Sequence, residues 1–176
     1  MQVFLIRHPP PAIESGICYG RLDIDCHDVE RVANALRPQL PTGIPVYSSP
    51  AKRALKLALE LSWSADVRID HRLSEIDFGH WEGQRWDAID RQAIDAWASD
   101  MLHFMPPGGE SVAALRARAI DFATSLTGDA AIVTHGGIMR ALVGHWKKLP
   151  FSAWTRLEFA FGELICLTLD QDARPA

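Results

Sequence analysis

The sequence has no apolar run long enough to cross a membrane, because none approaches about 18 residues. It also lacks a positively charged N-terminal segment followed by a long apolar stretch, so no signal peptide is predicted. Cysteine is scarce, and Cys18, Cys26 and Cys166 are odd in number and form no CxxC pair. Such cysteine usage fits a reducing compartment better than a disulfide framework. We therefore expect a cytoplasmic protein with no membrane partner.

Positive charge is also in short supply. The 176 residues include 18 Lys and Arg against 22 Asp and Glu, which gives a net charge of -4. A nucleic-acid partner is disfavoured, because it would require a basic face. A small anionic substrate stays compatible, since a local group of cations can form inside an acidic protein. The sequence has no Walker loop, no GxGxxG fingerprint and no cluster with metal-ligand spacing, so we expect neither cofactor nor metal.

Apolar patterning predicts alternating strands and helices in a single domain over residues 1–176. We expect strands over 3–6, 44–47, 67–69, 130–134 and 163–169. Helical periodicity lies between them, over 29–40, 50–59, 84–97, 112–126 and 138–146. Ser49 is expected to cap the second helix, and Glu110 to lie in the first turn of the fourth. The predicted fold class is α/β with a mainly parallel sheet.

Two of the predicted strands end in histidine. The first stops at Arg7 and His8, because the prolines at positions 9–11 cannot continue a paired strand or a helix. The fourth stops at His135, and Gly136 opens the next helix. The carboxyl ends of parallel strands share one edge of a sheet, where α/β proteins place their ligand crevice. An anion could approach the backbone N–H groups of that helix N-terminus.

Arg53 lies in the first turn of a predicted helix, where helix electrostatics favour an anion over a cation. Taken alone, this side chain could point into solvent. Together with Arg7, His8 and His135 it would complete a pocket for a dianion, since guanidinium groups bind phosphate in bidentate fashion. Two histidines could instead hold a metal ion, but the flanking arginines would repel a cation. These residues therefore favour phosphate.

Five motifs extend this pattern along the chain. They are Leu5-Ile6-Arg7-His8, Ser48-Ser49 with Arg53-Ala54, Leu73-Ser74-Glu75-Ile76-Asp77-Phe78-Gly79 with Trp81-Glu82-Gly83, Gly109-Glu110-Ser111, and Val133-Thr134-His135-Gly136-Gly137. In this order the motifs resemble those of the histidine phosphatase (phosphoglycerate mutase-like) superfamily, from residue 3 to about residue 142. The resemblance implies a single three-layer α/β/α sandwich with a mainly parallel central sheet.

The resemblance also implies a role for each site residue. His8 would be the nucleophile that becomes a phosphohistidine, and Glu75 the general acid that protonates the leaving oxygen and later activates water. Arg7, Arg53 and His135 would hold the phosphoryl oxygens. No divalent metal would be needed, because the arginines supply the charge. The implied activity is hydrolysis of a small phosphorylated metabolite with release of inorganic phosphate.

Substrate identity is less defined than this chemistry. The segment Cys18-Tyr19-Gly20-Arg21 resembles the small branch of the family described as α-ribazole-phosphatase-like. Tyr19 and Arg21 would then line the mouth of the pocket, and Gly136 would make a further substrate contact. α-Ribazole 5'-phosphate is accordingly a candidate substrate.

The sequence departs from the family pattern directly after the first histidine. The family typically has Arg-His-Gly-Glu-Thr, whereas here His8 is followed by Pro9-Pro10-Pro11. The N–H groups of Pro9 and Pro11 are missing, and so is the threonine hydroxyl. Glu14 stands where the family often has an asparagine near the phosphate. A carboxylate there would repel the ligand, so we expect Glu14 to turn away.

Three other functions stay open from the sequence. One is a phosphoglycerate mutase, although the chain is short and lacks obvious extra segments to retain a bisphosphate. Another is a protein phosphohistidine or phosphotyrosine phosphatase, which an open, shallow pocket would favour. The third is a phosphate-binding module without turnover, supported only by the prolines after His8. Oligomeric state is also open, with Trp146, Trp154, Phe159 and Phe161 expected in the core in preference to a dimer face.

Overall fold

The computed structural model describes residues 1–62 and 66–169. These residues form one five-stranded sheet with the strand order β3-β2-β4-β1-β5. Its strands are β1 (Gln2–Arg7), β2 (Val46–Ser48), β3 (Val67–Ile69), β4 (Ala130–Thr134) and β5 (Leu164–Thr168). Neighbouring strands are parallel except for β5, which is antiparallel to β1. The predicted mainly parallel sheet is thus confirmed, while the predicted domain end at residue 176 lies outside the described residues.

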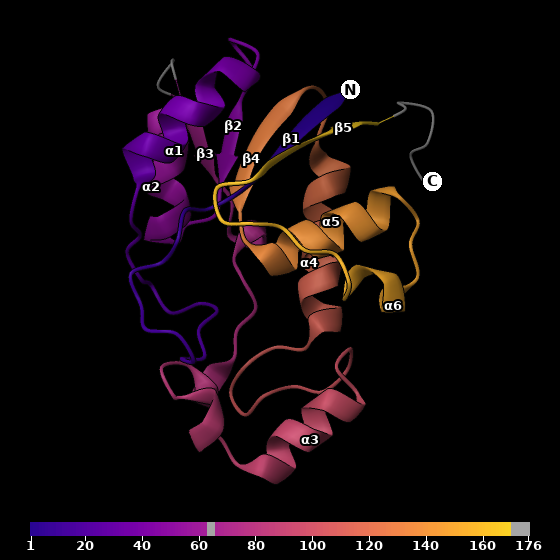
Figure 1. The fold of residues 1–176 in the computed structure, drawn as a ribbon. Coiled ribbons are helices and arrows are strands. Elements are labelled where there is room, and N and C mark those ends of the chain that lie inside the picture. The colour runs from indigo at the N-terminus through magenta and orange to yellow at the C-terminus, as the bar shows by residue number, and fades with distance from the viewer. Residues whose placement is uncertain (63–65, 170–176) are drawn as a thin grey trace.

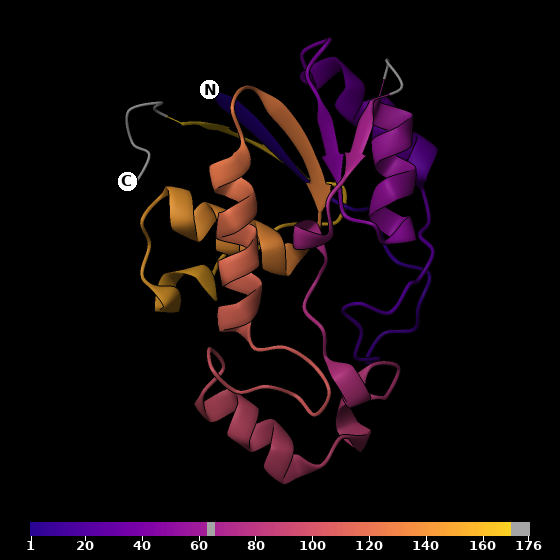
Figure 2. The same ribbon diagram turned by 180° about the vertical axis from the view of Figure 1, so that it is seen from behind.

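Helices cover both faces of this sheet (Figures 1 and 2). The helices of the described residues are α1 (Val29–Leu36), α2 (Lys52–Leu61), α3 (Arg91–Ser99), α4 (Val112–Ser125), α5 (Gly136–Trp146) and α6 (Phe151–Trp154), of which α3 lies beyond the end of the sheet. Because side chains alternate along a strand, β1 contributes to two cores. Phe4 and Ile6 pack with α1 and α2, whereas Val3 and Leu5 pack with α4 and α5. The result is the expected three-layer arrangement.

Two helices are shorter than predicted. The helix expected over 29–40 ends at Leu36, and Pro38 lies in a separate 3₁₀ turn because proline lacks the N–H that would continue the helix. The helix expected over 84–97 begins only after Asp90, whose carboxylate caps the first turn of α3. Apolar periodicity alone would extend both helices. A proline in one place and a capping aspartate in the other make them shorter.

The connection from β2 to α2 also differs from its prediction. The strand expected over 44–47 begins after Pro45, which has no N–H for the sheet. The helix expected from residue 50 begins at Lys52, and Ala51 is its N-cap. Ser49 is therefore not the N-cap of α2: its hydroxyl oxygen accepts from the Ala51 N–H at 3.3 Å, before the first helical residue, and also contacts His135.

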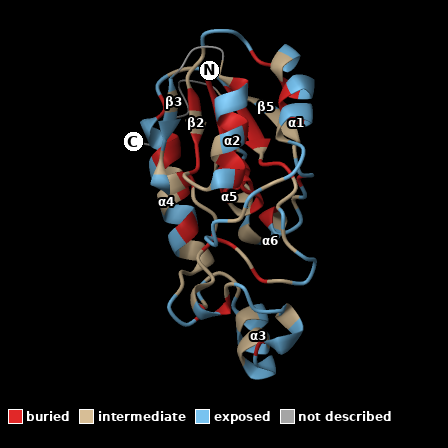
Figure 3. Ribbon diagram, turned by 90° about the vertical axis from the view of Figure 1, so that its left-hand side faces the viewer, coloured by how far each residue is buried: buried red, intermediate tan, exposed pale blue. Residues whose placement is uncertain are grey.

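The segment around α3 lies beyond the carboxyl edge of the sheet, at the end opposite the N-terminus (Figures 1 and 2). Cys18, Trp81 and Ile89 form a small buried cluster there, distinct from the two cores on the sheet. Cys18 joins the first long loop to this cluster, since its N–H donates to the Gln84 carbonyl oxygen at 2.8 Å. Figure 3 shows the contrast between buried strands and a largely exposed α3. This segment therefore covers the sheet edge where the predicted site lies.

None of the helices within residues 1–62 and 66–169 is long and apolar enough to span a bilayer. Cys18, Cys26 and Cys166 are free thiols.

Candidate active site

His8 and His135 lie side by side because their strands are neighbours in the sheet. Arg7, the last residue of β1, pairs in register with Thr134, the last residue of β4. The His8 N–H donates to the Thr134 carbonyl oxygen at 2.9 Å. The two imidazole ring centroids are 5.0 Å apart. Both rings are buried. The structure therefore brings the two strand-end histidines together, as the sequence predicts.

The surroundings of His8 fix its tautomer. Nδ1 lies 2.6 Å from the carbonyl oxygen of Pro9, and a carbonyl can only accept, so Nδ1 carries the hydrogen. Burial, followed by the charges of Arg53 and Arg7, lowers the pKa of His8 to about 3. At neutral pH the ring is therefore uncharged, and Nε2 holds a free lone pair. This is the state that a nucleophilic imidazole requires.

Arg53 is fully buried and does not point into solvent. Its Nη1 donates to the carbonyl oxygen of Leu22 at 2.8 Å, and its Nη2 to that of Gly20 at 2.5 Å. Burial lowers its pKa, but a guanidinium in a protein stays charged. Within the described residues no carboxylate forms an ion pair with Arg53, and a buried cation whose partners are carbonyl oxygens is a favourable site for an anion.

Arg7 is held from the opposite side. Its Nη1 donates to the carbonyl oxygen of Phe159 at 2.5 Å, and the Phe161 ring covers the guanidinium at 3.8 Å from Cζ to centroid. Cation–π stacking of this kind fixes the plane of the arginine. The Phe161 ring is also 5.4 Å from the His8 ring, so this aromatic side chain borders the site directly.

His135 receives its support from Ser49. The His135 Nε2 lies 2.7 Å from the Ser49 hydroxyl oxygen. Burial, and then the charges of His8 and Arg53, lower the pKa of His135 well below its ordinary value, so this ring is also neutral. Ser49 thus orients a histidine instead of capping α2.

Among the described residues, three buried side-chain nitrogens have no hydrogen-bond partner. They are Nε of Arg7, Nε of Arg53 and Nδ1 of His135. Buried polar groups are normally hydrogen-bonded, so such orphans require an explanation. A bound phosphate would supply acceptor oxygens to the two arginine N–H groups.

Glu75 reaches the site from the loop after a 3₁₀ turn at His71–Leu73. Its Oε1 accepts from the Ile76 N–H at 2.9 Å, and its Oε2 accepts from the Gly137 N–H at 3.1 Å. A Cβ at position 137 would meet the end of the Glu75 side chain, so any larger residue there would displace this carboxylate. The start of α5 therefore positions this carboxylate within electrostatic range of Arg7 and Arg53.

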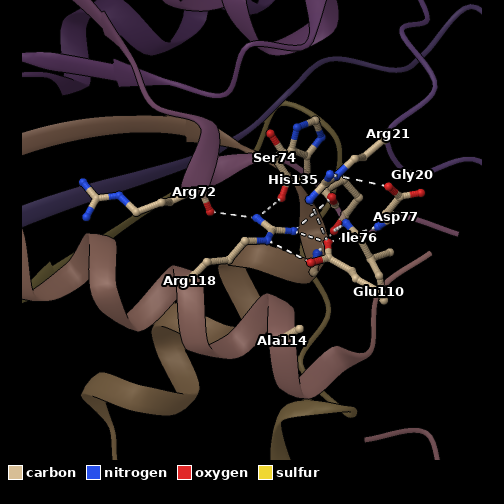
Figure 4. A network of polar contacts seen from close by, with 12 residues as sticks. Gly20, Arg21, Arg72, Ser74, Ile76, Asp77, Glu110, Ala114, Arg118 and His135 are labelled. Atoms are coloured by element: carbon tan, nitrogen blue, oxygen red, sulfur yellow. Dashed lines mark hydrogen bonds and ion pairs between the residues drawn. The ribbon is translucent and has the colours of Figure 1, made fainter. Parts of the chain in front are cut away.

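The main chain around Glu75 is held from α4 by Arg118 (Figure 4). Arg118 donates to the carbonyl oxygens of Ser74 at 2.5 Å and Glu75 at 3.1 Å. It also pairs with Glu110, at 2.6 Å between Nη2 and Oε1. Glu110 precedes the cap of α4, so the prediction that it lies in the first helical turn is wrong. Its carboxylate serves Arg118 because that buried cation lies within reach.

The three residues expected to contact the substrate, Tyr19, Arg21 and Gly136, lie at different places around the site. Tyr19 lies against Arg53, with Cζ 5.5 Å from the ring centroid. Arg21 is half exposed and lies 3.4 Å from both Asp77 and Glu110 carboxylate oxygens. Gly136 is buried next to Arg7. Tyr19 and Arg21 both line cavities that border Glu75, whereas Glu14 is exposed and lines neither of them, as expected.

Two cavities meet at Glu75. One, of about 300 Å³, is lined mostly by residues with polar side chains, among them Arg21, Ser49 and Ser74, and is called the polar cavity below. The other, of about 320 Å³, has apolar walls and includes Tyr19 and Arg140. A group bonded to a phosphorus atom near His8 could therefore extend in either of two directions.

Sequence reasoning did not identify Arg140, Arg118 or Phe161 as parts of the site. Arg140 had a usable signal, because it lies four residues after Gly136 and shares its face of α5. Phe161 was expected in the core, but it is 39% exposed and covers Arg7. Trp154 and Phe159 are buried as expected.

The low pKa of His8 predicts a dependence of stability on pH. The ordinary pKa of 6.5 applies to the unfolded chain, so between pH 6.5 and about 3 the unfolded chain binds a proton that the folded protein does not. The free energy of unfolding therefore falls as the pH falls. From pH 7 to pH 5, His8→Gln should lose about 2 kcal/mol less than the wild type.

Urea unfolding in phosphate-free buffer at both pH values measures this difference. His27→Gln, a change at an exposed histidine, is the matched control and should follow the wild type. Equal pH dependence in all three proteins would contradict the buried neutral state of His8.

Comparison with known proteins agrees with this geometry. The family model of the histidine phosphatase superfamily (branch 1) matches residues 3–175. A protein of Hydrogenobacter thermophilus, named as a candidate phosphoserine phosphatase 2, is 31% identical over 155 residues, covering 81% of this chain and 76% of its own. Glucosyl-3-phosphoglycerate phosphatase of Mycobacterium tuberculosis is 29% identical over 161 residues, covering 78% and 71%.

The fold has a solved counterpart. A crystal structure from Escherichia coli K-12, of a candidate alpha-ribazole-5'-P phosphatase, superposes with a TM-score of 0.87 over 97% of this chain and 91% of its own. Its sequence identity is 24%, so this likeness concerns the fold. With the family model matching nearly the whole sequence, the chain belongs to the histidine phosphatase superfamily, branch 1, and is a phosphoric monoester hydrolase.

Proposed function

We propose that this protein is a metal-independent phosphomonoesterase that hydrolyses a small phosphate ester through a phosphohistidine on His8. The observation that carries the proposal is the pair of arginine N–H groups, on Arg7 and Arg53, that lack a partner among the described residues and lie near a neutral His8. These donors match the oxygens of a phosphoryl group, and two fixed guanidinium charges match its negative charge.

The reaction would proceed in two displacements. In the first, the lone pair of His8 Nε2 forms a bond to phosphorus as the ester P–O bond breaks, and Glu75 gives a proton to the leaving oxygen. In the second, Glu75 takes a proton from water, the water oxygen bonds to phosphorus, and the P–N bond breaks. Inorganic phosphate is released and His8 returns to its neutral form. Arg7, Arg53 and His135 would stabilise the charge on the phosphoryl oxygens throughout.

The substrate is proposed to be a small phosphorylated metabolite, with α-ribazole 5'-phosphate as a specific candidate. Tyr19 and Arg21, whose segment suggested this candidate, both line cavities next to Glu75. Gly136 would let the substrate approach the N-terminus of α5 closely.

The experiment is an assay of phosphate release in EDTA, combined with a quench in alkaline detergent, which preserves a P–N bond, after brief exposure to a ³²P-labelled ester. The esters are p-nitrophenyl phosphate, nucleotides, sugar phosphates, phosphoglycerates and α-ribazole 5'-phosphate. We expect phosphate release without metal and an acid-labile label on the peptide that contains His8. Binding of phosphate without turnover would contradict the proposal, and transfer between phosphoglycerate positions would indicate a mutase instead.

A further inference from the structure

The apolar cavity at Glu75 has aromatic walls. Its volume of about 320 Å³ lies at the low end for small-molecule sites, which are roughly 300–1,000 Å³. Large apolar side chains from the first loop, α3, α6 and their connections surround it, namely Tyr19, Phe78, Trp97, Met101, Phe151 and Trp154. Aromatic rings of this kind pack well against another flat ring.

This cavity reaches the candidate active site at Glu75. Glu75 and Gly137 are part of its lining and are joined by a 3.1 Å hydrogen bond. Tyr19 contributes one wall and also lies against the buried Arg53. If the ester oxygen of the leaving group accepts a proton from Glu75, the carbon atoms bonded to that oxygen therefore lie at the mouth of this cavity.

Arg140 adds one cation to these apolar walls. Its Nε donates to the Leu157 carbonyl oxygen at 2.8 Å. Its Nη1 lies close to Arg7, since a Cβ at Gly136 would be 3.5 Å from both Nη1 of Arg140 and Cζ of Arg7. Within the described part of the chain, Arg140 has no ion-pair partner. Its terminal nitrogens therefore remain for an acceptor on a ligand.

The polar cavity on the other side of Glu75 is already paired internally. Arg21 lies 3.4 Å from carboxylate oxygens of Asp77 and of Glu110. The Gly20 carbonyl oxygen accepts from Arg53, and Asp23 pairs with Lys52 at 3.2 Å. A ligand in the polar cavity would have to replace these ion pairs and hydrogen bonds within the protein. A ligand in the aromatic cavity would instead bury apolar surface, which is favourable.

From this difference we propose that the aromatic cavity is the leaving-group site. The substrate class is then a phosphate ester of an alcohol that carries an aromatic ring, with a hydrogen-bond acceptor near the ester oxygen that binds Arg140. This inference rests on the proposed phosphomonoesterase function and adds the chemical class of its leaving group.

The test compares 3-phenylpropyl phosphate with propyl phosphate, whose leaving groups are both primary alkyl alcohols. We expect kcat/KM to be at least about 10-fold higher for the aromatic ester. Met101→Ala should remove most of this preference, because kcat/KM should fall more for the aromatic ester than for propyl phosphate. Met105→Ala is the matched control, because Met105 is 62% exposed and does not line the cavity.

A second arm tests the acceptor. The phosphate ester of 3-phenyllactate, which carries a carboxylate beside the ester oxygen, should react faster than 3-phenylpropyl phosphate, and Arg140→Gln should abolish that gain. Equal kcat/KM for propyl and 3-phenylpropyl phosphate would overturn the aromatic site. A preference for glucose 6-phosphate that is lost in Arg21→Ala would place the leaving group in the polar cavity and also overturn it.

Binding of 3-phenylpropylphosphonate, followed by tryptophan fluorescence, separates this inference from the proposed function. If no ester is hydrolysed but the phosphonate binds and Met101→Ala weakens its binding, the phosphatase proposal fails and the cavity assignment stands. If esters are hydrolysed and the phosphonate binds no better than propylphosphonate, the cavity assignment alone fails.

Discussion

The substitution His8→Gln is expected to lower kcat/KM for every phosphate ester by roughly 10⁴-fold or more, since loss of a covalent nucleophile removes the reaction path itself. Glutamine is uncharged, like the native imidazole, but its amide nitrogen has no lone pair available for attack on phosphorus. Arg7 and the buried Arg53 keep their surroundings, so inorganic phosphate should still bind.

Steady-state kinetics and phosphate binding by calorimetry measure these two properties on the same preparations. His27→Gln is again the control, and it should retain wild-type turnover because that side chain is exposed. The outcome that contradicts a phosphohistidine mechanism is residual turnover in His8→Gln within about 10-fold of the wild type.

The substitution Glu75→Gln is expected to act differently on different leaving groups. An alkyl ester needs a proton on its departing oxygen, so its turnover should fall by roughly 10²–10⁴-fold. The nitrophenolate of p-nitrophenyl phosphate departs without one, so phosphorylation of His8 should survive while hydrolysis of the phosphohistidine slows. Rapid mixing should therefore show a burst of about one nitrophenolate per site, followed by slow turnover.

Glu14→Gln provides the matched control, because Glu14 is an exposed carboxylate that lines neither cavity at Glu75. It should behave as the wild type with both esters. The assignment of Glu75 fails if Glu75→Gln slows both esters equally and leaves no labelled His8, since a merely structural change would have that result.

The strand-end residues could be predicted because their signal is local. An apolar run that ends in Arg7 and His8 before three prolines marks both a strand and its carboxyl edge. The same pattern at His135 indicates a second strand at the same edge. The convergence of Arg7, His8, Arg53 and His135 needed only the rule that parallel strands share that edge.

Other features could not be read from the sequence, because distant contacts decide them. Ser49 is a good helix cap by residue type, yet its hydroxyl contacts His135, which is 86 residues away in the sequence. Glu110 forms an ion pair with Arg118, and Arg118 also donates a hydrogen bond to the Glu75 carbonyl oxygen. Phe161 looks like a core residue by its apolar character, but the chain places it over Arg7.

The prolines after His8 acquire a physical role in the structure. Pro9 lacks an N–H, but its carbonyl oxygen accepts the hydrogen bond from Nδ1 of His8. A fixed proline φ angle reduces the motion of this carbonyl. The departure from the usual family sequence therefore retains the contact that defines the histidine tautomer.

The separation of hydrophobic clusters has a consequence for how this protein can change over evolution. The phosphate-facing residues stand on the two cores of the sheet, whereas Trp97 and its neighbours belong to the small cluster around Cys18 and Trp81. Substitutions in that cluster can reshape the cavity wall while the packing beneath His8 and His135 stays intact. A lineage can thus acquire new substrates by drift in one short segment, with the reaction chemistry inherited unaltered.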